Sequence, residues 1–150
     1  MSFPIETYQY AHAPRSPGLS VGVARNLPRG VRKGDYQRGG YFDVWLPMLA
    51  PTAGLVAAYR SGDLSFRAFS RHYRSAMKAP EARQVIRMLA ATSRVVPVRL
   101  GCFCEDARRC HRSILRELVE KATGELPAAE AGDEESRPFS PPCFMPEIDD

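Results

Sequence analysis

Apolar residues recur three and four positions apart in several stretches of the chain, the spacing that aligns them on one face of an α-helix. The clearest stretch predicts a helix that carries Phe66, Phe69, Tyr73 and Met77 on its inner face. Three further helices are expected: one through Leu55, Val56 and Tyr59, one that Pro80 opens, and one from about Cys110 to Ala122 that ends at Gly124. The pattern therefore predicts at least four helices.

Two other stretches have the composition of buried strands. Residues 19–24 alternate apolar and small side chains, and residues 95–102 form a run rich in β-branched residues, although Pro97 cannot donate a ladder hydrogen bond. An edge strand is also expected at residues 5–10, whereas residues 43–46 are expected to form a short helical turn. Strands and helices that alternate in this way predict a three-layer, Rossmann-like α/β fold with a small, mainly parallel sheet.

Composition divides the 150 residues into three parts. We expect an extended N-terminal lead-in over residues 1–18, a single α/β domain over residues 19–124, and an acidic, proline-rich C-terminal tail over residues 125–150. The net charge is +4, but the tail is acidic, so the domain itself is more basic than the whole chain. A basic domain favours anionic partners, either a small anionic ligand or nucleic acid.

The sequence favours a cytoplasmic protein with reduced thiols. No stretch approaches the roughly 18 to 20 apolar residues of a membrane-spanning helix, and the N-terminus lacks the apolar core of a secretion signal. We therefore expect no membrane partner. Three of the four cysteines lie within nine residues, which is unlike the spread framework of a disulfide-rich secreted domain. The oligomeric state cannot be inferred.

The candidate site is the segment that joins the predicted strand at 95–102 to the last predicted helix. The strand delivers Cys102, Cys104 and Glu105 to a loop, and the helix begins near Cys110 and His111. Ligands of open α/β folds bind at the carboxyl ends of strands, and a helix N-terminus attracts anions and lowers the pKa of a thiol. We therefore take Cys102, Glu105, Cys110 and His111 as candidate catalytic residues.

Several chemistries remain open for this segment. A zinc site could use Cys102, Cys104, Cys110 and His111, but adjacent helical residues point about 100° apart, so Cys110 and His111 could share a metal only on an irregular backbone. A redox pair of Cys102 with Cys104 would be strained, and a phosphatase loop from Cys102 to Arg108 would place two carboxylates beside the phosphate. The sequence favours an anion pocket without a cofactor over these chemistries, and simple packing and capping by the same residues is the main alternative.

The order of short motifs resembles the domain-of-unknown-function 488 (DUF488) family, which includes the YeaO-like proteins. The motifs are Arg25 with Pro28-Arg29-Gly30, Trp45-Leu46, Leu49-Ala50-Pro51, Phe69 with Tyr73, Leu89-Ala90, Leu100-Gly-Cys-Phe-Cys-Glu105 and Cys110-His-Arg112. The resemblance covers about residues 19–122 and implies a compact cytoplasmic α/β domain, with no agreed activity to carry over. It also implies that the fold does not need a structural zinc, because YeaO-like proteins lack the Cys102/Cys104 pair.

On this resemblance, Arg25 and Arg29 would face the loop from Cys102 to Arg112, so that Arg25, Arg29 and Arg112 would bind a substrate anion. Three functions follow as hypotheses. The first is a small enzyme or ligand-binding domain with an anion pocket. The second is a non-catalytic module for nucleic acid or protein that uses the basic loop 29–38 and the apolar stretch 137–146 around Cys143 in the tail. The third is a zinc-binding or thiol redox sensor.

Overall fold

A four-stranded sheet forms the centre of the fold in the computed structural model, which describes residues 2–128. The strands are β1 (Ile5–Gln9), β2 (Leu19–Gly22), β3 (Val44–Trp45) and β4 (Val98–Cys102). Their order is β1-β4-β2-β3, and every pairing is parallel. The expected edge strand is present as β1, and the carboxyl ends of all four strands meet at one edge of the sheet.

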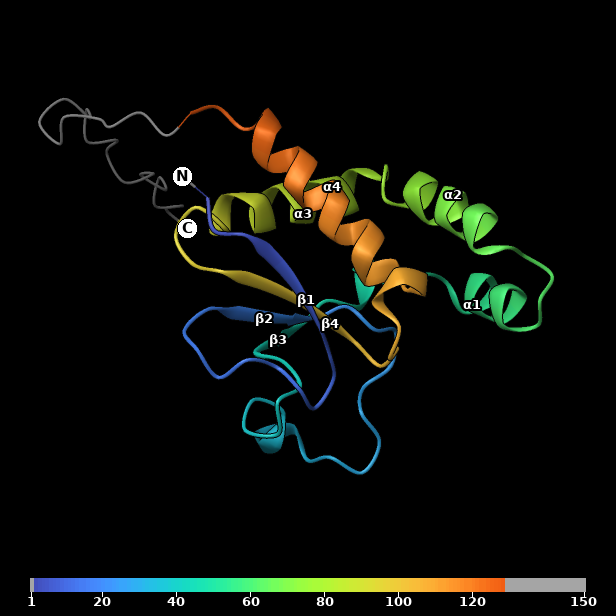
Figure 1. Cartoon of the computed structure of the whole chain (residues 1–150), viewed down its shortest axis with the longest axis horizontal. Helices are drawn as coiled ribbons and strands as arrows, with labels where there is room; N and C mark the ends of the chain where they lie inside the picture. The colour runs from blue at the N-terminus through green and yellow to red at the C-terminus, as the bar shows by residue number, and fades with distance from the viewer. Residues whose placement is uncertain (1, 129–150) are drawn as a thin grey trace, which may run out of the picture.

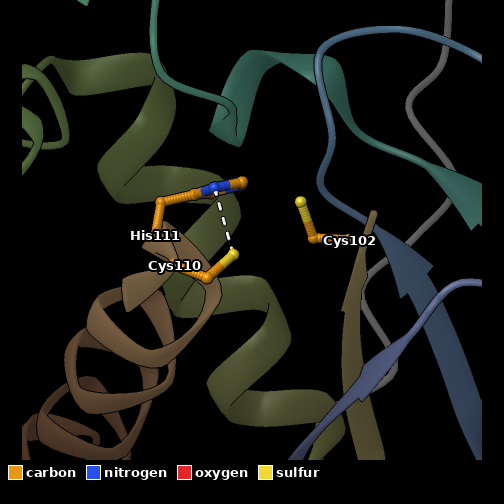
Figure 2. Close-up of side chains that lie close together, drawn as sticks. All are labelled: Cys102, Cys110 and His111. Atoms are coloured by element: carbon orange, nitrogen blue, oxygen red, sulfur yellow. Dashed lines mark hydrogen bonds between the residues drawn. The ribbon is translucent and has the colours of Figure 1, made fainter. Parts of the chain in front are cut away.

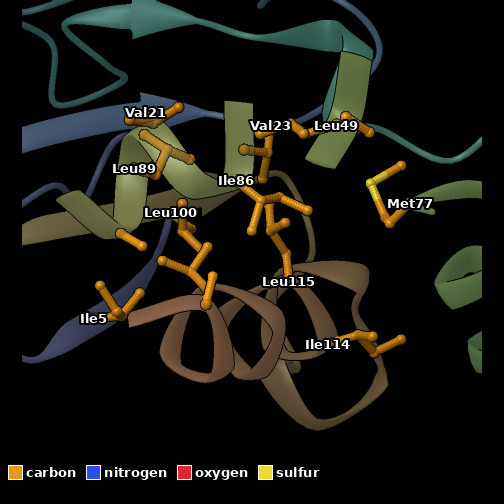
Figure 3. Close-up of a cluster of buried hydrophobic side chains, with 14 of the residues drawn as sticks. Ile5, Val21, Val23, Leu49, Met77, Ile86, Leu89, Leu100, Ile114 and Leu115 are labelled. Carbon is orange, nitrogen blue, oxygen red and sulfur yellow. The ribbon is translucent and has the colours of Figure 1, made fainter. Parts of the chain in front are cut away.

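Four α-helices cover one face of this sheet: α1 (Ala53–Arg60), α2 (Phe66–Ala76), α3 (Pro80–Thr92) and α4 (His111–Glu125). In Figure 1 α3 and α4 lie against the strands, with α4 nearest to β1 and β4, whereas α1 and α2 extend to the right of the strands. The core of this layer is mainly aliphatic, with Phe69 and Tyr73 as its buried aromatic residues. Figure 3 shows Leu89 and Leu115 packed with Val21 and Leu100 of the central strands. The apolar faces of the helices and of the strands thus pack together in a single apolar cluster.

Loops and aromatic side chains cover the opposite face of the sheet. Gly22 and Gly101 point to this side, where added Cβ atoms would collide with Phe42 and Tyr10 in one case and with Tyr8 in the other. These aromatic residues form a second buried cluster, separate from the aliphatic core. The three layers of the expected α/β fold are therefore helices, sheet and loops.

Two local predictions are wrong. Residues 43–46 do not form a helical turn, because Val44 and Trp45 pair with β2 as strand β3 and the Trp45 indole donates a hydrogen bond to the carbonyl oxygen of Ala24 at 2.8 Å. Gly124 does not end the last helix, which continues to Glu125. The helix ends just before Pro127, since a residue that precedes proline is sterically excluded from the helical conformation.

Most of the acidic tail expected at 125–150 lies outside the described residues, and so does Cys143. Among residues 2–128, no helix combines the length and the apolar character that crossing a membrane would require.

Candidate functional site

The candidate segment lies at the edge of the sheet where the strands end. Strand β4 ends at Cys102, and the chain returns through a short 3-10 helix at Ala107–Arg109 to the first residue of α4, His111. The carboxyl end of β2 lies beside β4, so that Val23 and Ala24 face the same region. This placement agrees with the general position of ligand sites in open α/β folds.

Two thiols and one imidazole converge there. The Sγ atoms of Cys102 and Cys110 and a ring nitrogen of His111 all lie within 4.8 Å of one another, and all three residues are buried. Cys110 Sγ is 3.7 Å from His111 Nδ1. Figure 2 shows the side chain from the end of β4 and the two from the start of α4 turned toward a common point.

The backbone just after β2 determines which nitrogen of His111 carries the proton. His111 Nε2 lies 2.7 Å from the carbonyl oxygen of Val23, which can only accept a hydrogen bond. Burial lowers the pKa of His111, so the ring is neutral and its one proton sits on Nε2. Nδ1 therefore presents a free lone pair toward Cys110.

A third thiol, that of Cys104, lies near this group and lines the same pocket. Hydrogen bonding from Cys102 and Cys110 lowers the pKa of the Cys104 thiol, which is half-buried. The same contacts raise the pKa of Cys102 and of Cys110, because each thiol keeps the proton that it donates.

Arg112 fixes the loop that carries two of these thiols. Its side chain is only 3% exposed, and its guanidinium donates to the carbonyl oxygen of Cys104 at 2.5 Å and to those of Cys102 and Glu105 at 3.4 Å. A guanidinium has a rigid fork of donors that suits several acceptors at once. Arg112 is therefore directed at backbone rather than at open space.

A pocket of about 400 Å³ opens beside the thiols and the imidazole. Its walls are largely apolar and include Val56, Tyr59 and Phe69 from the helical layer. The exposed side chains of Arg25, Arg60 and Arg109 also line it, and no carboxylate does so among residues 2–128. The pocket is thus positively charged at its exposed side and holds titratable groups at its buried side.

The structure brings together most of the residues that the sequence indicated. Arg25 lines the pocket with Cys102, Cys110 and His111, whereas Arg29 and Glu105 are exposed and do not line it. Arg60 and Arg109 were missed, as was the carbonyl group of Val23. Arg109 lies inside the candidate segment 102–112, so it could have been predicted as a basic residue near the start of the helix. Nothing in the sequence indicates that Arg60 lies near β4.

The fold and the site define an α/β domain with a cysteine- and histidine-lined pocket at the carboxyl edge of a parallel sheet. Over residues 5–123 the chain matches the family described as the active DUF488-N3 subclade, DUF488-N3a. It therefore belongs to the DUF488 family, as its motifs indicated. No curated protein and no solved structure matched the chain.

Proposed function

We propose that this protein is a small enzyme that binds a small anionic molecule in the pocket at the carboxyl edge of the sheet. The observation that carries the proposal is the lining of the pocket, which combines three exposed arginines with buried thiols and an imidazole and includes no carboxylate among residues 2–128. The description of the matching subclade as active agrees with catalysis. A phosphate or a carboxylate is the chemical group that such a pocket would select.

The N-terminus of α4 adds to this preference for anions. Cys110 is the N-cap of the 15-residue helix and has no side-chain cap hydrogen bond, so unpaired backbone N–H groups and the positive end of the helix dipole lie at the pocket. Within residues 2–128, Arg25, Arg60 and Arg109 form neither salt bridges nor side-chain hydrogen bonds. Their guanidinium groups are available to a ligand.

Arg112 has a different role in this proposal from the one that the sequence suggested. Its guanidinium holds the carbonyl groups of residues 102–105 and thereby positions Cys102 and Cys104. The ligand-binding arginines are then Arg25, Arg60 and Arg109, and the candidate reactive groups are Cys102, Cys110 and His111.

Calorimetric titration with inorganic phosphate, pyrophosphate and a set of nucleoside phosphates tests the proposal. At least one should bind the wild-type protein, and Arg25→Gln, Arg60→Gln and Arg109→Gln should each weaken its binding about fivefold to tenfold, or about 1 to 1.4 kcal/mol. Arg83→Gln is the matched control, because Arg83 is an exposed helical arginine outside the pocket. Equal losses in all four variants would show non-specific charge attraction and refute the pocket.

A second candidate function, nucleic-acid binding, is favoured by a basic groove on the helical layer. The groove lies between α2, α3 and α4, and its cationic lining consists of Arg71, Arg74, Lys78, Arg83, Arg87 and Lys121. Arg74 is partly neutralised by Glu117. The groove does not include the basic loop 29–38 that the sequence suggested for this role.

Fluorescence anisotropy with a single-stranded oligonucleotide separates the two candidates. If the groove binds nucleic acid, affinity should fall steeply as salt rises, and the double variant Arg83→Glu, Arg87→Glu should abolish binding. Arg25→Glu changes the charge in the pocket rather than in the groove, so it should leave oligonucleotide binding nearly unchanged. No binding at low salt would eliminate this second function.

A further inference from the structure

We propose that Cys102, Cys110 and His111 bind a zinc ion through two Sγ atoms and Nδ1, and that the fourth coordination position opens into the pocket. The site would be the reactive centre of the enzyme proposed above, so the inference rests on that function and deepens it. Four features support the site: the positions of the donor atoms, the backbone that carries them, their outer contacts and the balance of charge.

The donor atoms are already near the spacing that zinc requires. With Zn–S bonds of about 2.3 Å and a Zn–N bond of about 2.0 to 2.1 Å, tetrahedral geometry separates the ligand atoms by about 3.6 to 3.8 Å. Cys110 Sγ and His111 Nδ1 are 3.7 Å apart, and the two Sγ atoms and one ring nitrogen of His111 all lie within 4.8 Å of one another. Small side-chain rotations therefore suffice to close the site around an ion.

The backbone removes the objection that adjacent residues cannot share a metal. Cys110 precedes the first helical residue and has an extended conformation, with φ −129° and ψ 145°, whereas His111 is the first residue of α4. The two side chains are thus not related by the rotation of about 100° per residue within a helix. Both can turn toward Cys102 at the end of β4, as Figure 2 shows.

The contacts outside the donor set suit a metal ligand. A histidine ligand commonly donates its second ring N–H to a carbonyl or carboxylate, which fixes the tautomer and the ring orientation. His111 Nε2 has this contact with the carbonyl group of Val23, and Nδ1 is left as the free donor atom. Arg112 in turn holds the carbonyl group of Cys102. The donor atoms are therefore held in place by neighbours from β2 and α4.

The balance of charge favours two thiolate ligands and an open position. Two thiolates neutralise Zn²⁺ and the imidazole is neutral, so the buried site carries no net charge, which limits the cost of burying ions. A third thiolate would make the site anionic and would repel the anion that the arginines attract. Cys104 does not belong to the set of atoms that lie within 4.8 Å of one another. Its thiol lines the pocket beside the open position.

X-ray absorption spectroscopy of the full chain loaded with one equivalent of zinc is the direct test. We expect two sulfur ligands at about 2.3 Å and two nitrogen or oxygen ligands at about 2.0 to 2.1 Å, one of them from water. Three sulfur ligands would overturn the open position. Failure to retain zinc after gel filtration would overturn the site itself.

Variants identify the ligands by metal content, measured by native mass spectrometry. Cys102→Ser, Cys110→Ser and His111→Gln should each weaken zinc binding by more than the roughly 10- to 100-fold loss typical of outer contacts. Serine is a favoured N-cap, so Cys110→Ser should keep α4 intact, and circular dichroism checks this. Cys104→Ser, Cys143→Ser and His72→Gln are the matched thiol and imidazole controls and should retain zinc. Loss in Cys104→Ser or Cys143→Ser would assign a fourth protein ligand and refute the open position.

Anion binding, measured separately on zinc-free and zinc-loaded protein, distinguishes failure of this inference from failure of the proposed function. A phosphate-bearing ligand should bind the loaded protein at least about tenfold more tightly. If both forms bind the anion equally well, the arginine-lined pocket is supported, but the proposal that the zinc ion is part of the anion site is refuted. Zinc retention without any anion binding would keep the metal site and refute the proposed function.

Discussion

Arg112 shows how a single buried charge can act on a functional loop without contacting a ligand. Its neighbours are three backbone carbonyl groups, which cannot neutralise it formally but can accept strong, charge-assisted hydrogen bonds. The carbonyl group of Cys102 also accepts from the Tyr10 N–H at 2.9 Å, so Arg112 matters most for the half-buried carbonyl group of Cys104, to which it makes its shortest contact. The sequence indicated the residue correctly as part of the site, but not the direction of its guanidinium.

Arg112→Lys should destabilise the protein by about 2 to 3 kcal/mol, because one ammonium group cannot replace a fork that reaches three acceptors and the half-buried carbonyl group of Cys104 would lose its donor. Urea unfolding measures this loss. The matched control is Arg116→Lys one turn further along α4, where a half-exposed arginine lies 3.9 Å from Glu120. That change should cost less than about 0.5 kcal/mol. Equal effects would mean that the carbonyl contacts contribute nothing specific.

At the scale of elements, the sequence predicted what local periodicity determines. The four helices and the strands at residues 5–9, 19–22 and 98–102 follow from apolar spacing, which burial against a single sheet enforces. Strand β3 was missed because a two-residue strand has no period of its own. Its pairing comes from the open edge of β2 and from the Trp45 contact with Ala24, both of which depend on tertiary structure.

Gly101 in β4 packs closely against a neighbouring strand, and the spacing of apolar residues in the sequence does not predict this contact. Gly101 lies against the ring of Tyr8 in β1, and the Tyr8 hydroxyl donates a hydrogen bond to the carbonyl oxygen of Tyr41. That bond holds the ring in place, so it cannot swing aside for a larger residue. Gly101→Ala should therefore destabilise the protein by about 1 to 3 kcal/mol, toward the upper end of the usual cost of overpacking. Thermal unfolding followed by circular dichroism measures this cost.

Gly124→Ala is the matched control for that change, and we expect it to act in the opposite direction. Gly124 is exposed in the last turn of α4, and an added Cβ would meet nothing within 4 Å. Alanine there should stabilise the helix by up to about 1 kcal/mol. If both alanine variants had the same sign, the overlap with Tyr8 could not be the cause.

At the scale of the whole molecule, the site depends on segments that are distant in the sequence. Residues 102–112 were identifiable because a strand end, three cysteines and a helix start coincide there. The wall that α1 contributes, including Arg60, was not identifiable, since it depends on how the helical layer packs across the sheet. The positive charge of the pocket could therefore be recognised only from the structure, whereas its candidate reactive groups could be predicted from the sequence.

Because the proposed zinc ligands join β4 to α4, metal binding should stabilise the whole domain. A metal that binds only the folded state adds about 2.7 kcal/mol when its free concentration is 100 times its dissociation constant. Differential scanning calorimetry should therefore show a higher melting temperature for zinc-loaded protein than for chelator-treated protein. The chelated form should still unfold cooperatively, because the aliphatic core between the helices and the sheet contains none of the ligands. His111→Gln should melt at the same temperature with and without zinc, whereas a zinc-dependent shift in that variant would place the stabilising metal elsewhere.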